Sequence, residues 1–379
     1  MISFYYIVSA NAETDINDEM MIKESYITEK LDKSIKEIFD STGVVKVTRT
    51  GLAGIRLLNL DSKPDLAVQV ETKESEQYLI VFEVKSTGQP RYARMAVNQL
   101  QSILVNRKNV YGVFGAPFVS EESKKICREA GIGYLDLAGN CFLRFNSVYI
   151  SIEGGPNPYP ATRPLKSIFS TKSTRALRVL LCNPKKDWFV KDLAKEAAIS
   201  IGQASNLKKR LLEYELIEQI DHERGMKFRI ANPEALLTRW ADNYSYLKNR
   251  IKNYYSLDEV KTIEKKLVDY FNAKQILYAF TLTSGASLVA PALRYKRVFA
   301  YVSSDSDCIG QELGLKEVTS GPNVSLLEPY DDGVFYGVHE VQWSKVVSDI
   351  QLFLDLKSYK ERGEEAARFI LEQRLRKQW

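Results

Sequence analysis

The sequence predicts an α/β protein built from several domains, and three observations lead to this fold class. The chain has 379 residues, enough for two or three domains that each bury a core of their own. Hydrophobic residues make up 45% and charged residues 27% of the chain, which is globular composition. Between residues 20 and 152, helical and strand-like segments follow one another as in a mixed sheet covered by helices.

The composition argues against several kinds of protein. No uninterrupted apolar run approaches about 20 residues, so we expect no membrane span. The first ten residues carry no basic region, which argues against a secretory signal and favours a cytoplasmic location. The scattered cysteines and histidines indicate neither a zinc site nor a disulfide framework. They are Cys127, Cys141, Cys182, Cys308, His222 and His339. We therefore expect chemistry that uses carboxylates, lysines and arginines.

Two breaks divide the chain into three predicted domains. Segment 153–160 is rich in glycine and proline and is followed by Pro164, so it cannot belong to a helix or strand. Asn232-Pro233 marks the second break. The predicted domains are 1–160, 163–232 and 234–379.

The first domain is predicted to contain three helices and at least six strands. Met20–Asp40 has Ile27, Leu31 and Ile35 at helical spacing, and two β-rich runs flank the polar turn 71–77 as in a hairpin. The hairpin strands are Leu66–Val70 and Tyr78–Val84. The later elements are helices Arg91–Val105 and Glu121–Ala130 and strands Val110–Phe114, Tyr134–Leu137, Cys141–Phe145 and Val148–Ile152.

The hairpin carries a group of charged residues that needs a physical reason. Asp65 is followed after 17 residues by Glu83-Val84-Lys85. Alternate residues of a strand share a face, so Glu83 and Lys85 point the same way. An unpaired charge at a buried strand end is costly, and a bound Mg²⁺ would offset that cost through oxygen ligands. We expect Asp65, Glu83 and the carbonyl of Val84 to hold this ion, with Lys85 positioning the attacking water.

This pattern resembles the PD-(D/E)XK nuclease superfamily over residues 20–150. The resemblance implies a restriction-endonuclease-like mixed sheet and a catalytic set of Asp65, Glu83 and Lys85 that uses Mg²⁺, or Mn²⁺ as a substitute. It further assigns a helical acid to Glu24, in preference to Glu29, and a helical glutamine to Gln99, with Gln101 as second choice. A surface hairpin with a simple Glu–Lys pair is the alternative.

The excess positive charge lies in one segment. Residues 163–230 hold 15 Lys and Arg against 8 Asp and Glu, a net charge of +7, whereas the rest of the chain has −2. Clustered basic charge is typical of modules that bind polyanions, although a solvated basic face is also compatible with it.

The same segment predicts three helices followed by two strands. They are Ser173–Leu181, Lys191–Ala198, Gln203–Tyr214, Leu216–Ile220 and Met226–Ile230, with Trp188–Val190 as an extra short strand. This order resembles a winged helix-turn-helix, in which Ser200 is a good N-cap for the recognition helix. With Ala204 and Leu207 buried, the outward residues would meet double-stranded DNA. The predicted contacts are Gln203, Ser205, Asn206, Lys209 and Arg210 on the helix and Arg224 and Lys227 on the wing. A winged domain used for protein contacts is the alternative.

The last domain begins with an apolar stripe at spacings of three and four residues. Its members are Leu237, Trp240, Tyr244, Leu247, Ile251 and Tyr254. The stripe predicts a helix, either packed on the domain core or in a homodimer interface.

Further on, strand Leu277–Leu282 precedes a turn at Thr283–Ser287 and a strand at Arg297–Val302. A Gly-Ser turn is similar to the phosphate cradle of nucleotidyltransferases. The following strand lacks their paired aspartates, since Asp305 and Asp307 come later. We therefore expect no transferase activity, and a degenerate nucleotidyltransferase-like domain or a partner-binding domain instead.

The strings Gly133–Asn140 and Ser348–Leu356, together with the winged helix, resemble the AbiEi-like antitoxins and regulators of abortive-infection (type IV toxin–antitoxin) loci. The resemblance implies DNA-binding autoregulation of a phage-defence operon and a cognate toxin as partner. A simple turn that ends a strand is the alternative for Asp136, Gly139 and Asn140. Two functions remain: a regulator or antitoxin that carries a nuclease-like domain, and a Mg²⁺-dependent DNA endonuclease targeted by its winged helix.

Overall fold

The structure is a computed structural model that describes residues 23–51, 63–157, 168–290, 295–359 and 363–379. The chain separates into two units, Met1–Pro160 and Ala161–Trp379, and each contains a seven-stranded mixed sheet with helices. This agrees with the predicted α/β multidomain class. The predicted domain limits stay predictions, and Met20 and Pro164 lie outside the described residues. Within the described ranges, no helix is long and apolar enough to cross a membrane.

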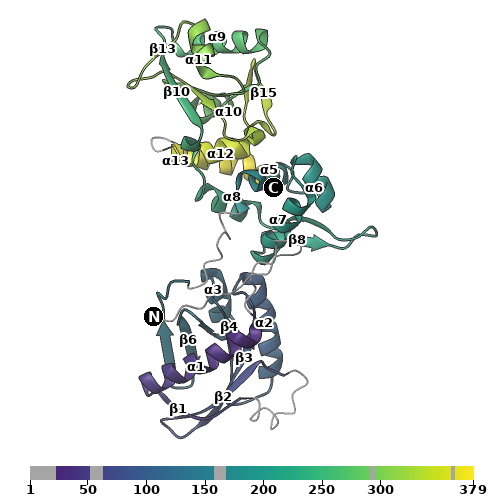
Figure 1. Ribbon diagram of the computed structural model, residues 1–379, viewed down its shortest axis with the longest axis vertical. Helices are drawn as coiled ribbons and strands as arrows, with labels where there is room; N and C mark the ends of the chain where they lie inside the picture. The colour runs from purple at the N-terminus through teal and green to yellow at the C-terminus, as the bar shows by residue number, and fades with distance from the viewer. Residues whose placement is uncertain (1–22, 52–62, 158–167, 291–294, 360–362) are drawn as a thin grey trace, which may run out of the picture. The chain divides into compact units, whose positions relative to one another are not determined.

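The sheet of the first unit has its strands in sequence order, from β1 to β7 (Figure 1). Strands β1 to β3 are antiparallel, β3 to β5 are parallel, and β5 to β7 are again antiparallel. The strands are β1 (Val45–Thr50), β2 (Leu66–Thr72), β3 (Gln77–Val84), β4 (Val110–Ala116), β5 (Gly133–Asp136), β6 (Cys141–Phe145) and β7 (Val148–Ile152). The two parallel steps need crossover helices, and α2 (Pro90–Leu104) and α3 (Glu121–Glu129) provide them.

Helices cover both faces of this sheet. Helix α1 (Glu24–Thr42) packs on one face, and α2 and α3 pack on the other. On β3, Ile80, Phe82 and Val84 belong to the core under α1, whereas Val81 belongs to the core under α2 and α3. The alternation predicted for this strand is therefore confirmed. The hairpin is confirmed as well, with Leu66 opposite Phe82.

The second unit begins with three helices and a two-stranded hairpin, in the predicted order. The helices are α5 (Thr171–Cys182), α6 (Val190–Glu196) and α7 (Ile201–Glu213), and the strands are β8 (Ile217–Ile220) and β9 (Lys227–Ile230). Because Val190 already begins α6, the short strand expected at Trp188–Val190 is reduced to an isolated bridge between Trp188 and Phe228. Both side chains are buried, so the hairpin is fixed to the helices through this contact.

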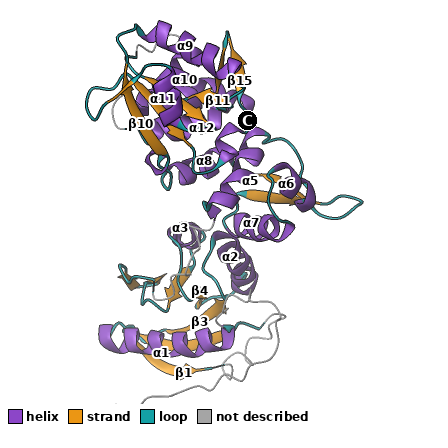
Figure 2. Cartoon of the chain, turned by 45° about the horizontal axis from the view of Figure 1, so that its top comes forward, coloured by secondary structure: helices purple, strands orange, loops and turns teal. Residues whose placement is uncertain are grey.

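A second sheet follows, with the strand order β13-β10-β14-β12-β11-β16-β15 (Figure 2). Its strands are β10 (Arg250–Tyr255), β11 (Tyr278–Phe280), β12 (Val298–Val302), β13 (Lys316–Glu317), β14 (Val324–Glu328), β15 (His339–Val341) and β16 (Ser344–Val346). The helices around it are α8 (Pro233–Ala241), α9 (Val260–Ala273), α10 (Leu282–Val289), α11 (Ser306–Glu312), α12 (Asp349–Lys357) and α13 (Gly363–Ile370).

Helix α12 lies at the centre of the second unit. All eight residues from Asp349 to Leu356 are buried, on every side of the helix. It packs against four helices, α5, α8, α10 and α13. A helix without a solvent face has no amphipathic pattern, and its polar residues must find partners inside the protein.

The predicted helix over the stripe from Leu237 to Tyr254 is correct only as far as Ala241. Helix α8 ends there, and residues 250–255 form strand β10, which pairs with β14 and β13. Leu247 is 62% exposed and so is not part of a buried stripe. The spacing was ambiguous because β-branched and aromatic residues also suit a strand, and sheet pairing decided between the two.

The predicted turn at Thr283–Ser287 is also wrong, because these residues lie inside α10. Gly285 permits this packing: a Cβ at that position would lie 2.9 Å from the carbonyl oxygen of Phe280. The hydroxyl of the buried Ser284 accepts a hydrogen bond from the N–H of Phe299 at 2.9 Å and donates to the carbonyl of Thr281 at 3.0 Å. The segment therefore offers no phosphate cradle.

Candidate functional site

The carboxylate–lysine cluster lies where strand β3 ends. Lys85 Nζ donates a hydrogen bond to Glu83 Oε1 at 2.5 Å, so the two side chains are on the same side, as expected. Glu83 is only 6% exposed. A charged pair this far from water must be held by its surroundings, because burying either partner alone would be costly.

Two further carboxylates come to the same strand end. The hairpin register places Asp65 opposite Glu83, and Asp65 Oδ2 accepts the N–H of Val84 at 2.7 Å. Glu24, from the start of α1, accepts the N–H of Ser86 through Oε1 at 3.2 Å. The structure thus brings together Asp65, Glu83, Lys85 and Glu24.

Burial raises the pKa of Glu83, and the negative charges of Asp65 and Glu24 raise it further, while the hydrogen bond from Lys85 lowers it. A pKa raised by burial and neighbouring charges is common at functional sites, although structural ion pairs show it too.

The carboxylate oxygens of this cluster could supply some, but not all, of the ligands that a hard cation such as Mg²⁺ needs. Asp65 Oδ1 and Glu83 Oε2 have no hydrogen-bond partner among the described residues, and Mg²⁺ commonly binds through one or two carboxylates plus water. Among the residues that the structure describes, no group of three or more His, Cys, Asp or Glu side chains is arranged to hold a metal ion. The cluster therefore fits a two-carboxylate site and does not form a closed metal cage.

The glutamines assigned by resemblance lie elsewhere. Gln99 and Gln101 are exposed on α2, whose buried face consists of other residues. The contacts of the described residues include none between Gln99 and Glu83 or Lys85. Glu29, the second choice for the helical acid, is likewise exposed and has no contact with the cluster.

The second candidate site is the exposed face of α7. Ser200 Oγ accepts the N–H of Gln203 at 3.2 Å, and Gln203 Oε1 accepts the N–H of Ser200 at 3.1 Å. This reciprocal capping box fixes where the helix begins. Ala204 and Leu207 are buried, as predicted.

The side chains predicted to face outward mostly do so. Those that are exposed are Gln203, Ser205, Asn206 and Lys209 on α7 and Arg224 between β8 and β9. Arg210 is half-buried and takes part in an interaction within the chain. Lys227 is also half-buried, with its ammonium 5.1 Å from the ring centre of Phe189. The ring of His222 packs edge-on against the same phenylalanine, which ties the hairpin tip to the start of α6.

Part of the basic charge of this module is used internally. Arg175 pairs with Asp331 at 2.7 Å, and Arg178 is fully buried. The charge count alone therefore overstates the positive charge that faces solvent. Besides Lys209, the exposed lysines of this module lie on α5 and on or just before α6, at Lys172, Lys185, Lys186, Lys191 and Lys195.

Arg178 belongs to a buried polar network that sequence reasoning missed. Its Nε and Nη2 donate to Gln351 Oε1 at 3.0 and 2.7 Å. Gln351 Nε2 donates to Asp355 Oδ1 at 2.9 Å, and Asp355 also accepts the hydroxyls of Tyr244, at 2.5 Å, and Tyr301, at 3.1 Å. The network joins α5 to α12, and so fixes the three-helix module to the rest of the unit.

Asp355 is the most strongly desolvated acid of this network. Burial raises its pKa from 3.8 to about 6, against the lowering effect of its hydrogen bonds, which include one from Thr281 Oγ1 at 2.5 Å. The one signal in the sequence was a pair of polar residues, Gln351 and Asp355, four apart in the apolar string Ser348–Leu356.

The string Gly133–Asn140 also ends in a buried polar cluster. Asp136 Oδ1 accepts the N–H groups of Ala138 and Asn140 at 3.0 and 2.9 Å, and Oδ2 accepts the N–H of Val119 at 3.1 Å. Burial raises the pKa of Asp136, whereas these bonds lower it. The contacts describe a turn that ends strand β5.

Residues 229–376 match the model of a protein family described as "Transcriptional regulator, AbiEi antitoxin, Type IV TA system". The match covers less than half of the chain and begins in β9, so it includes the second sheet and α12 but neither the carboxylate–lysine cluster nor α7. No curated protein and no solved structure matches the chain.

Proposed function

We propose that this protein is a DNA-binding transcriptional regulator and antitoxin of a type IV toxin–antitoxin system. The observation that carries the proposal is the family match over residues 229–376. The matched region begins in the last strand of a module of three helices and a hairpin, and α7 of this module has an exposed polar face. Transcriptional regulation by such a chain needs a surface that reads DNA, and α7 with the β8–β9 hairpin is the candidate.

The α5-α6-α7-β8-β9 order supports a winged helix-turn-helix. In this proposal α7 enters the major groove. Asn206 and Gln203 suit adenine edges, whereas Lys209 suits a phosphate or guanine, and Arg224 and Lys227 on the hairpin contact the backbone. Arg210, the other predicted contact to guanine or phosphate, is half-buried and takes part in an interaction within the chain.

A second function is favoured by the cluster in the first unit. The order α1-β1-β2-β3-α2-β4 and the convergence of Asp65, Glu83 and Lys85 support a PD-(D/E)XK nuclease-like domain. If the domain is active, Asp65 and Glu83 would hold Mg²⁺, and the ion would supply charge neutralisation at the scissile phosphate. Lys85 would hold or move a proton at the attacking water, and Glu24 would order the backbone at Ser86. If the protein is instead only a regulator, this domain would be an inactive scaffold.

The DNA proposal is tested by binding of the full chain to duplex DNA from its own promoter. Lys209→Ala should weaken binding by a similar factor on all sequences and reduce the salt dependence by about one counterion. Asn206→Ala should mainly relax sequence preference, by about 1–3 kcal/mol at one base pair. Lys265→Ala, an exposed lysine on α9, is the matched control and should bind as the wild type does.

The absence of any mobility shift at low salt would contradict the DNA proposal. Equal loss in Lys209→Ala and Lys265→Ala would show that net charge, and not α7, sets the affinity. The proposed toxin partner is tested separately, by co-purification of the full chain with the product of the neighbouring gene.

A further inference from the structure

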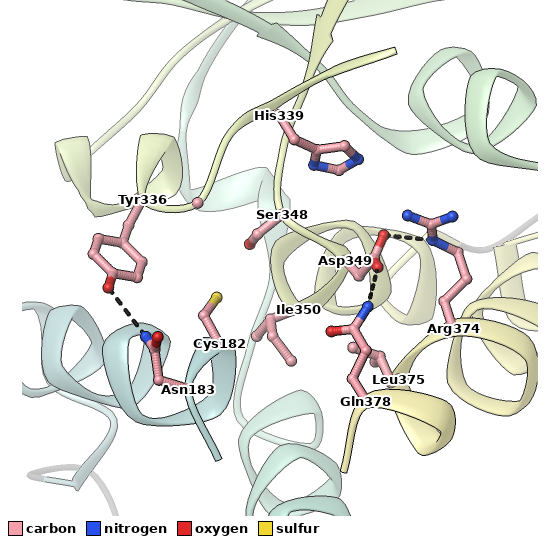
Figure 3. A pocket seen from close by; sticks show the side chains of 11 residues that line it. Cys182, Asn183, Tyr336, His339, Ser348, Asp349, Ile350, Arg374, Leu375 and Gln378 are labelled. Atoms are coloured by element: carbon pink, nitrogen blue, oxygen red, sulfur yellow. Dashed lines mark hydrogen bonds and ion pairs between the residues drawn. The ribbon is translucent and has the colours of Figure 1, made fainter. Parts of the chain in front are cut away.

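A cavity of about 390 Å³ lies within the second unit (Figure 3), and its lining residues include none from α7 or the β8–β9 hairpin. Four separate segments of the chain line it. They are the end of α5 with Cys182 and Asn183, the stretch from Tyr336 to His339, and the start of α12 together with residues 374–378. Cavities of this size are typical of sites for small ligands, which bind where a few polar groups converge.

Arg374 and His339 both have nitrogen atoms in or beside the cavity without a hydrogen-bond partner among the described residues. Arg374 gives its Nε to Asp349 Oδ1 at 2.8 Å, and neither of its Nη groups has a partner among the described residues. The Nε2 atom of His339 is buried and has no hydrogen-bond partner within the described part of the chain. In the first turn of α12, Ser348 Oγ accepts the N–H of Gln351 at 3.2 Å, which leaves the N–H groups of Asp349 and Ile350 without an intrahelical partner.

The negative charge of Asp349, the acid in the cavity, is already balanced by partners within the protein. Asp349 is 8% exposed, and its second oxygen, Oδ2, accepts Gln378 Nε2 at 3.1 Å. Figure 3 shows this carboxylate between Arg374 and Gln378, with His339 above them. Arg374 contacts this carboxylate through Nε alone, so its Nη groups are available to a ligand.

Two features of the backbone keep the cavity open. Arg374 and Leu375 lie in a π-helical turn, Leu371–Leu375, an irregularity that costs helix stability and occurs frequently at functional sites. Gly337 has φ +74°, and a Cβ there would come within 3.2 Å of Ser348 Cβ and 3.4 Å of Cys182 Sγ. A larger residue at Gly337 would therefore be strained and would fill the cavity.

We propose that this cavity binds a small anion bearing a phosphate or carboxylate group. Arg374 and His339 would hold the anion next to the first turn of α12. The guanidinium Nη groups supply the charge-assisted contacts, His339 Nε2 adds a hydrogen bond, and Asn183 and Tyr336 border the rest of the ligand. Since α5 and α12 both line the cavity, the bound anion would strengthen the connection between the three-helix module and the second sheet. The site does not depend on whether the protein binds DNA.

The test is isothermal titration of the full chain with sodium phosphate and, separately, sodium succinate, at ionic strength held constant with sodium chloride. We expect saturable one-to-one binding of at least one anion, and the anion that binds identifies the group recognised. Arg374→Gln should weaken binding about tenfold or more, the factor expected for a lost charge-assisted hydrogen bond. His339→Ala provides a second variant if Arg374→Gln does not fold. Arg368→Gln, at an exposed arginine on α13, is the matched control and should bind like the wild type.

Heats indistinguishable from a chloride titration for both anions would overturn the proposal. So would anion binding that both site variants leave unchanged, or that Arg368→Gln weakens equally. If neither anion binds but Arg374→Gln weakens DNA binding as much as Lys209→Ala, the arginine contacts a DNA phosphate and the small-anion site is wrong.

Discussion

Asp355 makes the stability of the second unit depend on pH in an unusual direction. Its carboxyl is fully buried, and burial raises its pKa from 3.8 to about 6. At intermediate pH the folded protein therefore holds a proton that the unfolded chain has released. The contribution of this group is fully present below pH 3.8 and is lost as the pH rises through about 6.

The size of the effect follows from the two pKa values. A rise from 3.8 to about 6 corresponds to about 3 kcal/mol over the whole range. About 2 kcal/mol of this falls between about pH 4.5 and pH 7.5, where the native state is easier to study. Asp355→Asn removes the titration and retains the shape of the side chain. The free energy of unfolding of this variant, minus that of the wild type, should therefore increase by about 2 kcal/mol across that interval.

Urea denaturation followed by tryptophan fluorescence measures this difference. All four tryptophans lie in the second unit, so the signal reports on that unit alone. They are Trp188, Trp240, Trp343 and Trp379. Asp258→Asn is the control, because the hydrogen bond from Lys266 lowers the pKa of this half-buried acid. Its carboxyl is ionised in both the folded and the unfolded chain across this interval, so the difference for this variant should stay nearly flat. A difference that stays flat for Asp355→Asn would refute the reasoning, since it would mean that Asp355 is ionised in the folded protein throughout.

Two further predictions concern the two candidate sites. Ser200→Ala removes the capping box of α7 and should lower the stability of the second unit by about 1 kcal/mol, whereas Ser200→Asp should retain most of it, as measured by the same denaturation. If the nuclease-like domain is active, Lys85→Ala should abolish nicking of supercoiled plasmid with Mg²⁺ or Mn²⁺ yet leave DNA affinity nearly unchanged, because Lys85 acts mainly in the transition state. Nicking that persists undiminished in both Asp65→Ala and Lys85→Ala would identify a contaminant, and a wild type that never nicks but represses its own promoter would indicate a scaffold.

The sequence predicted those parts of the fold that local pattern determines. The hairpin around residues 71–77 and the three helices before β8 follow from the period of the apolar residues and from breakers. Ser200 was recognisable as a cap because its side chain acts on residues three positions away. Glu83 and Lys85 were placed together for a similar reason, since the strand period puts them on one side.

The features that were missed depend on contacts distant in sequence. Residues 250–255 have a spacing that fits a helix, but pairing with β14, more than 70 positions later, makes them a strand. Asp355 receives hydrogen bonds from Tyr244, Thr281 and Tyr301, and no local pattern shows that these residues meet. Gln99 was assigned from a family pattern, and the orientation of α2 places it on the exposed side.

The central position of α12 has a consequence for synthesis of the protein. The helix begins at residue 349 of 379, and it fills the space between elements made much earlier, from α5 at residue 171 onward. A nascent chain therefore cannot complete the core of the second unit until nearly all of it has left the ribosome, whereas the first unit is whole after residue 160. We expect protease treatment of chains stalled before residue 349 to spare the first unit and digest the second. A premature stop codon thirty codons from the end would therefore leave the second unit, which includes α7, without a complete core. Resistance of the second unit in such stalled chains would show that its core closes without α12.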